Sequence, residues 1–325
     1  MKTVPHIQFD AWRIPQRAVV WPAGTRAAFS LIEILLVVTL LSLIMLALMA
    51  VFNSTQTAFR ASITQTDVLQ GGRATMDMIT SDFRQMSPSD NIYAPNLTSN
   101  LNNISSPVNF WLSRQGVTLY QSLIGVSQNQ VRTNQIQSFF ILSYQNQVWK
   151  GVGYFVDPYS TNYIFPLYRY DSSVIPGRPT PIQIFSAFLD NLSIPGFPAS
   201  DNNTNIHHLL DGVVHLNVRA YDPNGVQLTN GYPFGQSYVI HNATFINYPS
   251  SEVSMILCSN TLPAAVEIQL GVLEDRTLSR AASFGLVAPP NSTYNYSNYL
   301  SQQSGKVHLF RQRVTIPNAD PTVYQ

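Results

Sequence analysis

One carboxylate in this chain stands where a charge is costly. Glu33 lies near the start of Phe29–Phe52, a run of 24 residues with no other charged side chain. Within a membrane helix, an ionised side chain raises the free energy of insertion by roughly 2.5–3.5 kcal/mol at the bilayer centre and by less near an end, and it usually has a partner. Glu33 is therefore the first candidate functional residue, and its chemistry is ion pairing. The simpler alternative is a carboxylate that reaches the lipid headgroups.

Residues of catalytic or metal-binding type are otherwise scattered. The sequence has no G-x-S-x-G, phosphate-binding glycine loop, H-E-x-x-H or C-x-x-C motif, so we expect neither an enzyme nor a cofactor. His207 and His208 are adjacent, would point apart on a regular element, and are expected in a surface loop. The oxygen-rich segments 201–205 and 222–225 lack the spacing of a calcium loop, so they are predicted to be turns and no metal site is expected.

The chain has one cysteine, Cys258, and therefore no internal disulfide. It ends the apolar run Val253–Cys258. A reactive thiol needs exposure and a lowered pKa, so this setting predicts a buried, inert thiol.

Charge is sparse and unevenly placed. Charged residues make up 11% of the chain and the net charge is +1, which leaves no basic patch for nucleic acid, and no nucleic-acid partner is expected. Residues 1–28 carry four basic side chains and one acidic side chain, whereas residues 53–325 have 14 basic and 15 acidic ones. By the positive-inside rule, the N-terminal leader stays in the cytoplasm and the bulk of the chain is exported.

The apolar run Phe29–Phe52 is long enough to cross a bilayer, which takes about 20 residues in a helix. It exceeds the 7–15 apolar residues that are typical of a secretory signal, and no A-x-A cleavage site follows it. The sequence therefore predicts a retained membrane anchor.

Helical spacing continues beyond the apolar run as one apolar stripe on a polar helix, ending before Pro88. Gly71-Gly72 interrupts the pattern and predicts a kink or a break, because each glycine costs roughly 1 kcal/mol in a helix interior. The stripe consists of Phe52, Phe59, Ile63, Met76, Ile79, Phe83 and Met86.

Beyond residue 106 the chain has mainly β-branched and aromatic runs bounded by turn residues, which predicts strands. A turn at Asn224-Gly225 follows the clearest strand. A short helix is expected over Asp275–Phe284, and loops are expected over 190–206 and 288–304. The expected strands are Val108–Leu112, Val117–Ile124, Ile136–Ser143, Val148–Val156, Tyr163–Tyr170, Ile182–Phe188, Val213–Tyr221, Tyr238–His241, Ala265–Val272 and Val307–Ile316.

The segment Arg26–Val38 reads R-A-A-F-S-L-I-E-I-L-L-V-V. It resembles the prepilin-type cleavage and methylation motif of type IV pilins and type II secretion pseudopilins. The resemblance implies that prepilin peptidase cuts between Ala28 and Phe29 and that Phe29 becomes N-methylated; Ala28 stands where the family mostly has glycine. Two further segments, Gly72–Gln85 and Leu262–Leu270, are most like the J-type pseudopilin and the W-type minor pilin.

This resemblance implies an α+β fold, in which a long N-terminal helix packs on a mostly antiparallel β-sheet domain. Its parts would be a leader (1–28), a transmembrane half-helix (29–52), an amphipathic half-helix (53–87) and an exported domain (88–325). Glu33 would pair with the amino terminus of a neighbouring subunit during assembly. Helix packing is expected from Leu31, Ile32, Leu35, Leu36, Phe52 and Phe59.

The implied function is that of a minor subunit at the tip of a secretion pseudopilus or pilus. Its partners would be prepilin peptidase, other pilin subunits and the inner membrane of a Gram-negative-type bacterium. The alternative is a membrane-anchored extracytoplasmic binding or adhesion protein that uses a pilin-like export signal.

Overall fold

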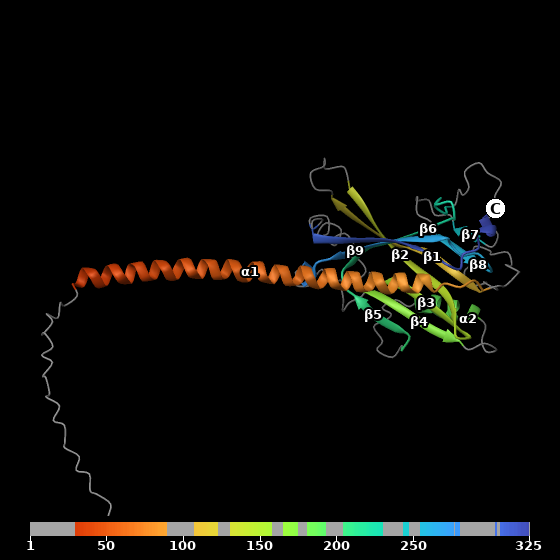
Figure 1. Ribbon diagram of the computed structural model, residues 1–325, viewed down its shortest axis with the longest axis horizontal. Coiled ribbons are helices and arrows are strands. Elements are labelled where there is room, and N and C mark those ends of the chain that lie inside the picture. The colour runs from red at the N-terminus through yellow and green to blue at the C-terminus, as the bar shows by residue number, and fades with distance from the viewer. Residues whose placement is uncertain are drawn as a thin grey trace, which may run out of the picture. The chain divides into compact units, whose positions relative to one another are not determined.

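The computed structural model describes residues 30–89, 107–122, 131–157, 165–174, 181–192, 204–229, 243–246, 254–275, 277–279, 303 and 306–324. The chain divides into two units, Met1–Ala58 and Phe59–Gln325, which are described separately. The elements labelled in Figure 1, together with β10, are α1 (Leu31–Arg84), β1 (Val108–Ser122), β2 (Val131–Gln145), β3 (Val148–Val156), β4 (Leu167–Val174), α2 (Pro181–Leu192), β5 (Ile206–Leu210), β6 (Val213–Tyr221), β7 (Ala243–Ile246), β8 (Ser254–Cys258), β9 (Ala265–Leu273) and β10 (Val307–Thr315).

The described part of the chain thus has one long, apolar N-terminal helix and a mostly antiparallel sheet of ten strands, consistent with the expected α+β class. The main path of the sheet runs β10-β9-β6-β2-β1-β8-β7. A second arm, β3-β4-β5, also starts at β2, so the sheet forks there. The parallel pair in this sheet is β2 with β6, which meet at Ile136 and Leu216.

Two side chains complete the short parallel seam at the fork. The backbone N–H of Val218 on β6 donates to Oε1 of Gln137 on β2, at 2.6 Å. The backbone N–H of Gln135 donates to Nδ1 of His215, at 3.0 Å. Because Nδ1 accepts here, a neutral His215 ring carries its proton on Nε2. The two bonds satisfy the backbone N–H groups of Val218 and Gln135, at a place where β2 and β6 pair through only one residue each.

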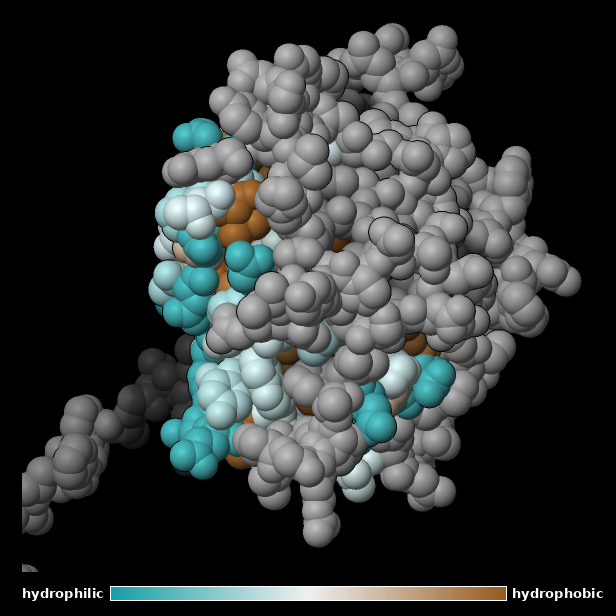
Figure 2. Space-filling view, turned by 90° about the vertical axis from the view of Figure 1, so that its right-hand side faces the viewer, coloured by the Kyte–Doolittle hydropathy of each residue, from teal (hydrophilic) through white to brown (hydrophobic). Residues whose placement is uncertain are grey.

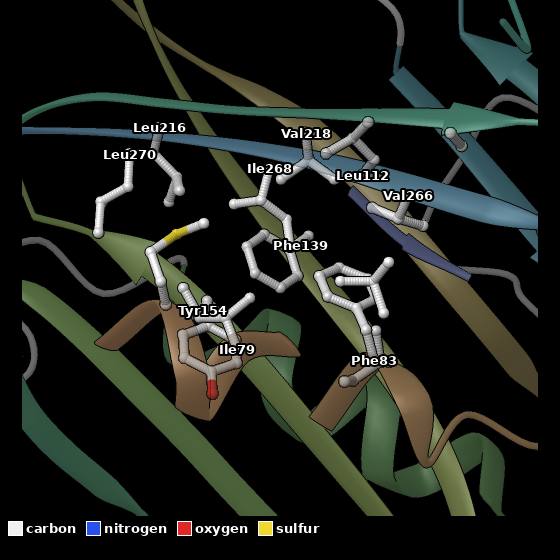
Figure 3. Close-up of a cluster of buried hydrophobic side chains, with 14 of the residues drawn as sticks. Ile79, Phe83, Leu112, Phe139, Tyr154, Leu216, Val218, Val266, Ile268 and Leu270 are labelled. Carbon is white, nitrogen blue, oxygen red and sulfur yellow. The ribbon is translucent and has the colours of Figure 1, made fainter. Parts of the chain in front are cut away.

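The C-terminal turns of α1 supply the centre of the main hydrophobic core. Met76, Ile79, Phe83 and Met86 are buried, so the predicted apolar stripe is confirmed for these four residues. Figure 3 shows Ile79 and Phe83 among side chains from both arms of the sheet. Phe139 of β2 stacks on Phe83 with ring centroids 5.2 Å apart.

The two glycines of α1 mark no break, because the helix continues through them to Arg84. They lie where the arms of the sheet approach it. Gly71 faces Leu210 of β5, and Gly72 faces the ring of Phe310 of β10. A Cβ at Gly72 would lie 2.3 Å from the Phe310 ring, so this glycine is needed for close packing, and the predicted break is wrong.

A second core lies under helix α2, against β3, β4 and β1. Gly151 and Gly153 of β3 make room for it, since a Cβ at either position would come within 2.3 Å of Ile184 or Phe188. The strand expected over Ile182–Phe188 is wrong. Pro181 occupies the first helical turn, where its missing N–H costs nothing. The apolar positions of α2 recur at three and four residues, which is the period of a helix.

Several expected strands are confirmed with nearly unchanged bounds. Val148–Val156 and Val213–Tyr221 are strands β3 and β6 as predicted, and β9 and β10 differ from prediction by one residue at their ends. The two runs expected near residue 112 join into β1, with a register shift between Arg114 and Thr118. The expected strand Tyr238–His241 lies outside the described residues, and so does the expected loop 288–304 except for residue 303, which is in a turn.

Three strands were not anticipated, namely β5, β7 and β8. β5 begins at residue 206, the last residue of the predicted loop 190–206, and carries His207 and His208, so their expected place in a surface loop is wrong. β8 contains the apolar run that ends at Cys258. Residues 275 and 277–279 are helical, and the rest of the helix expected up to Phe284 lies outside the described residues.

Candidate functional site

The start of α1 places Glu33 in the first turn, three residues after Ser30. The N–H of Glu33 donates to Oγ of Ser30 at 3.3 Å and to its carbonyl oxygen at 3.0 Å. Ser-x-x-Glu is the spacing of a capping box, in which these two residues satisfy free N–H groups at a helix start. A negative charge in the first turn also interacts favourably with the helix dipole. Glu33 therefore has a local role that the sequence analysis did not consider.

The surface of α1 that follows is apolar and uncovered. The helix contains an 18-residue window, long and apolar enough to cross a membrane, none of which is buried. Exposed apolar patches of this size mark contact with a membrane or another protein. All six residues expected to pack against other helices are exposed: Leu31, Ile32, Leu35, Leu36, Phe52 and Phe59.

The hydroxyl groups within this stretch are bonded inside the helix. Thr39 donates to the carbonyl oxygen of Leu36 at 2.9 Å, and Ser42 donates to that of Thr39 at 2.8 Å. Polar groups satisfied in this way are compatible with a hydrocarbon environment. Glu33 is then the one ionisable side chain between Leu31 and Phe52.

The described surface of the sheet unit differs from that of the helix. On the face drawn in Figure 2, the coloured residues are mostly hydrophilic or intermediate, and the hydrophobic ones form small patches. Single exposed apolar side chains are normal on a soluble domain.

A buried charge network fixes α1 to the β3-β4 arm. Asp82 of α1 accepts two hydrogen bonds from the guanidinium of Arg169, from Nε at 2.9 Å and from Nη2 at 3.3 Å. The hydroxyl of Tyr154 donates to the same carboxylate at 2.5 Å. Burial and the neighbouring Asp82 raise the pKa of Tyr154. Burial alone would lower the pKa of Arg169, but its hydrogen bonds to Asp82 raise it. Tyr154 and Arg169 therefore both stay protonated at neutral pH.

Sequence reasoning did not single out Asp82. The sequence feature that could have indicated its burial is its spacing. Asp82 lies three residues after Ile79 and therefore on the buried side of the helix. A carboxylate on that side requires a partner. Its partner Arg169 lies 87 residues further along the chain, which no local pattern shows.

The remaining candidate residues are the two adjacent histidines, Cys258 and the expected processing site. His207 and His208 contact Asp171 and Asp211 respectively, at 3.0 and 2.8 Å. Among the described residues, no group of three histidine, cysteine or acidic side chains could hold a metal ion. Cys258 is buried as predicted, and burial raises the pKa of its thiol to about 12. Ala28 and Phe29 lie outside the described residues.

The chain matches no family model, no curated protein and no solved structure.

Proposed function

We propose that this chain is a non-enzymatic minor pilin or pseudopilin. It would be anchored in the inner membrane by the N-terminal part of α1, with the sheet unit exported. Prepilin peptidase would remove the leader between Ala28 and Phe29, and the mature chain would join a secretion pseudopilus or a type IV pilus. The observation that carries the proposal is the uncovered apolar surface of α1 with one carboxylate, Glu33, in its first turn.

An ordinary anchor needs apolar length but no acid. After cleavage, the amino group of Phe29 would carry a positive charge close to the membrane. The Glu33 carboxylate of a neighbouring subunit could neutralise it, and a close ion pair is much stronger in a medium of low dielectric constant than in water. Because an unpaired charge is penalised there, pairing would favour one axial register between neighbouring helices.

The test is the chemical identity of the mature N-terminus. The protein is purified from membranes of strains with and without prepilin peptidase, and its intact mass and N-terminal sequence are determined. We expect a chain that begins with methylated Phe29, and only in the strain that has the peptidase. A chain that keeps Met1 in both strains would rule out the proposal and favour the membrane-anchored binding protein.

A large sheet unit favours a place at the tip of a fibre, because bulky subunits fit poorly into a close-packed shaft. Immunogold labelling should then find the protein at fibre ends. Even labelling along the fibre would contradict the tip position without affecting the proposed processing.

A further inference from the structure

Strand β10 is an edge of the sheet with a long, regular backbone. It pairs with β9 at every residue from Val307 to Thr315, without a bulge. Among the described residues, no strand pairs with its other side. About half of the N–H and C=O groups of such a strand point away from its neighbour. Proteins usually shorten, bend or cover edges of this kind, because they can pair with another chain.

The outward face of β10 and its neighbours is positively charged. Glu267 of β9 stands opposite Arg219 of β6 and Arg313 of β10. Nη2 of Arg311 lies 2.9 Å from Oε2 of Glu267, and Nη1 of Arg219 lies 3.9 Å from Oε1. The guanidinium of Arg313 lies 4.3 Å from the ring centroid of Tyr221. Two arginines thus share the Glu267 carboxylate and a third stands opposite it in the strand register, which leaves an excess of positive charge around Glu267.

These side chains are available to a partner. The side chain of Arg311 is 62% exposed, and Leu309, two residues before it on the same face, is 46% exposed. On the opposite face of the strand, Phe310 packs against the core cluster and Val314 belongs to it. Leu309, Arg311 and Arg313 therefore line one face of the edge strand, at the spacing of alternate residues. A strand added beside β10 would place its own alternate side chains next to them.

The charge pattern argues against a second copy of this chain as the occupant. In an antiparallel pair of two β10 strands centred on Arg311, that arginine would face its own counterpart. A shift by one pair of residues would set Arg311 of one copy against Arg313 of the other. Like charges directly opposite each other destabilise a strand pair, whereas opposite charges stabilise it.

We propose that β10 is a strand-addition site for an extended acidic segment of a different protein. The backbone of that segment would continue the sheet, and its alternate carboxylates would pair with Arg311 and Arg313. This mode of recognition takes affinity from main-chain hydrogen bonds and specificity from alternate side chains. The proposal does not depend on how the N-terminal helix is processed or assembled.

The probes are fluorescent peptides that match the nine residues of β10 in length. One alternates threonine with glutamate, and its matched control alternates threonine with lysine. Two further acidic peptides carry N-methyl groups on one or the other set of alternate amides, so that one of the two can no longer donate to β10. Binding to the full chain in detergent is followed by fluorescence anisotropy.

We expect the acidic peptide to bind at least about tenfold more tightly than the basic one. One of the N-methylated peptides should bind much more weakly than the other, because an added strand presents only one set of its amides to β10. Equal binding of acidic and basic peptides would overturn the proposal. Equal binding of all the acidic peptides would also overturn it, since that result describes a general anion-binding surface.

Variants of the arginines locate the site. The double variant Arg311→Gln with Arg313→Gln should lose the preference for the acidic peptide. Arg73→Gln, on an exposed position of α1, is the matched control and should bind as the wild type does. Circular dichroism establishes that each variant is folded. An unchanged preference in the folded double variant would show that β10 is not the site.

Discussion

A Cβ atom built on Gly72 would lie 2.3 Å from Cε2 of Phe310. Real Cβ atoms do not approach other heavy atoms so closely, so Gly72 is the residue that lets β10 pack on α1. Its neighbour Gly71 faces Leu210 of the opposite arm, at 3.2 Å from the Cδ1 atom. A pair of residues that weakens an isolated helix thus allows both arms of the sheet to contact it.

Substitution of the two glycines should give opposite results. Gly72→Ala forces the Phe310 ring to move, so we expect a net loss of about 1–2 kcal/mol in the free energy of unfolding, within the usual cost of overpacking. Gly71→Ala meets a milder contact and gains about 1 kcal/mol of helix propensity, so it should be neutral or stabilising. Denaturant unfolding of the full chain in detergent, followed by tryptophan fluorescence, measures both.

A companion variant tests whether Phe310 is the cause. Phe310→Leu combined with Gly72→Ala should cost less than the sum of the two single changes, because the ring that clashes is gone. Additive costs, or a Gly72→Ala variant more stable than the wild type, would contradict this account of the glycine.

The Asp82–Arg169 pair should couple strongly. Their side chains are only 10% and 12% exposed. Asp82→Asn leaves the buried guanidinium with only the partly exposed Asp171, 3.5 Å from Nη1, as a counter-charge, so we expect a loss of about 3 kcal/mol. Asp82→Asn combined with Arg169→Met should cost clearly less than the two single changes together. The measurement is a double-mutant cycle on the unfolding free energy.

A surface pair provides the control for this cycle. Lys150 lies 3.6 Å from Asp171, and both side chains are about a third exposed, at 39% and 30%. Lys150→Met should therefore change stability by less than about 1 kcal/mol. If Asp82→Asn proved equally harmless, the buried network would not hold α1 to the sheet.

Acid should weaken the sheet through Glu267. Burial alone would raise the pKa of this carboxyl, but hydrogen bonds from Arg311 and Gln269 lower it below its ordinary value. A carboxyl with a lowered folded-state pKa stabilises the protein above its unfolded pKa, and that contribution is lost as the pH falls through the folded value. Stability should thus decline from about pH 5 downwards. Glu267→Gln should flatten part of that decline, as measured by unfolding midpoints at several pH values.

The control for this prediction is a second acid whose pKa is lowered elsewhere. Asp320 accepts hydrogen bonds from the backbone N–H and hydroxyl of Thr322, and these lower its pKa. Asp320→Asn should leave the contribution of Glu267 intact. An unchanged acid profile in Glu267→Gln would mean that its ion pairs do not contribute to stability.

Much of the fold could be predicted because it depends on local pattern. The stripe around Ile79 and Phe83 has helical spacing over a long segment, and β-branched alternation marks β6. The seven residues Ile182–Phe188 are too few to distinguish a strand from a helix by their apolar spacing. The helical period is visible only over all 12 residues of α2.

The rest depends on contacts between distant residues. Gly72 reads as a helix breaker until Phe310 is placed beside it, and Asp82 reads as an ordinary polar residue until Arg169 is known to face it. The fork of the sheet at β2 is likewise set by a single parallel pair. At the candidate site, the unusual position of Glu33 in an apolar run could be found from the sequence. Its hydrogen bond to Ser30 adds a second role, helix capping, and composition alone does not separate this role from ion pairing between subunits.

Two substitutions separate the two roles of Glu33. Glu33→Gln keeps a side chain that suits a capping box but removes the charge, whereas Ser30→Ala removes the cap and keeps the charge. If the charge pairs subunits, Glu33→Gln should insert in the membrane normally yet lower recovery in the assembled fibre about tenfold, or ~1.4 kcal/mol. Ser30→Ala should assemble almost as the wild type does. Immunoblots of membrane and sheared-fibre fractions measure both steps. The reverse result would assign Glu33 to helix capping, because assembly would then follow the cap and not the charge.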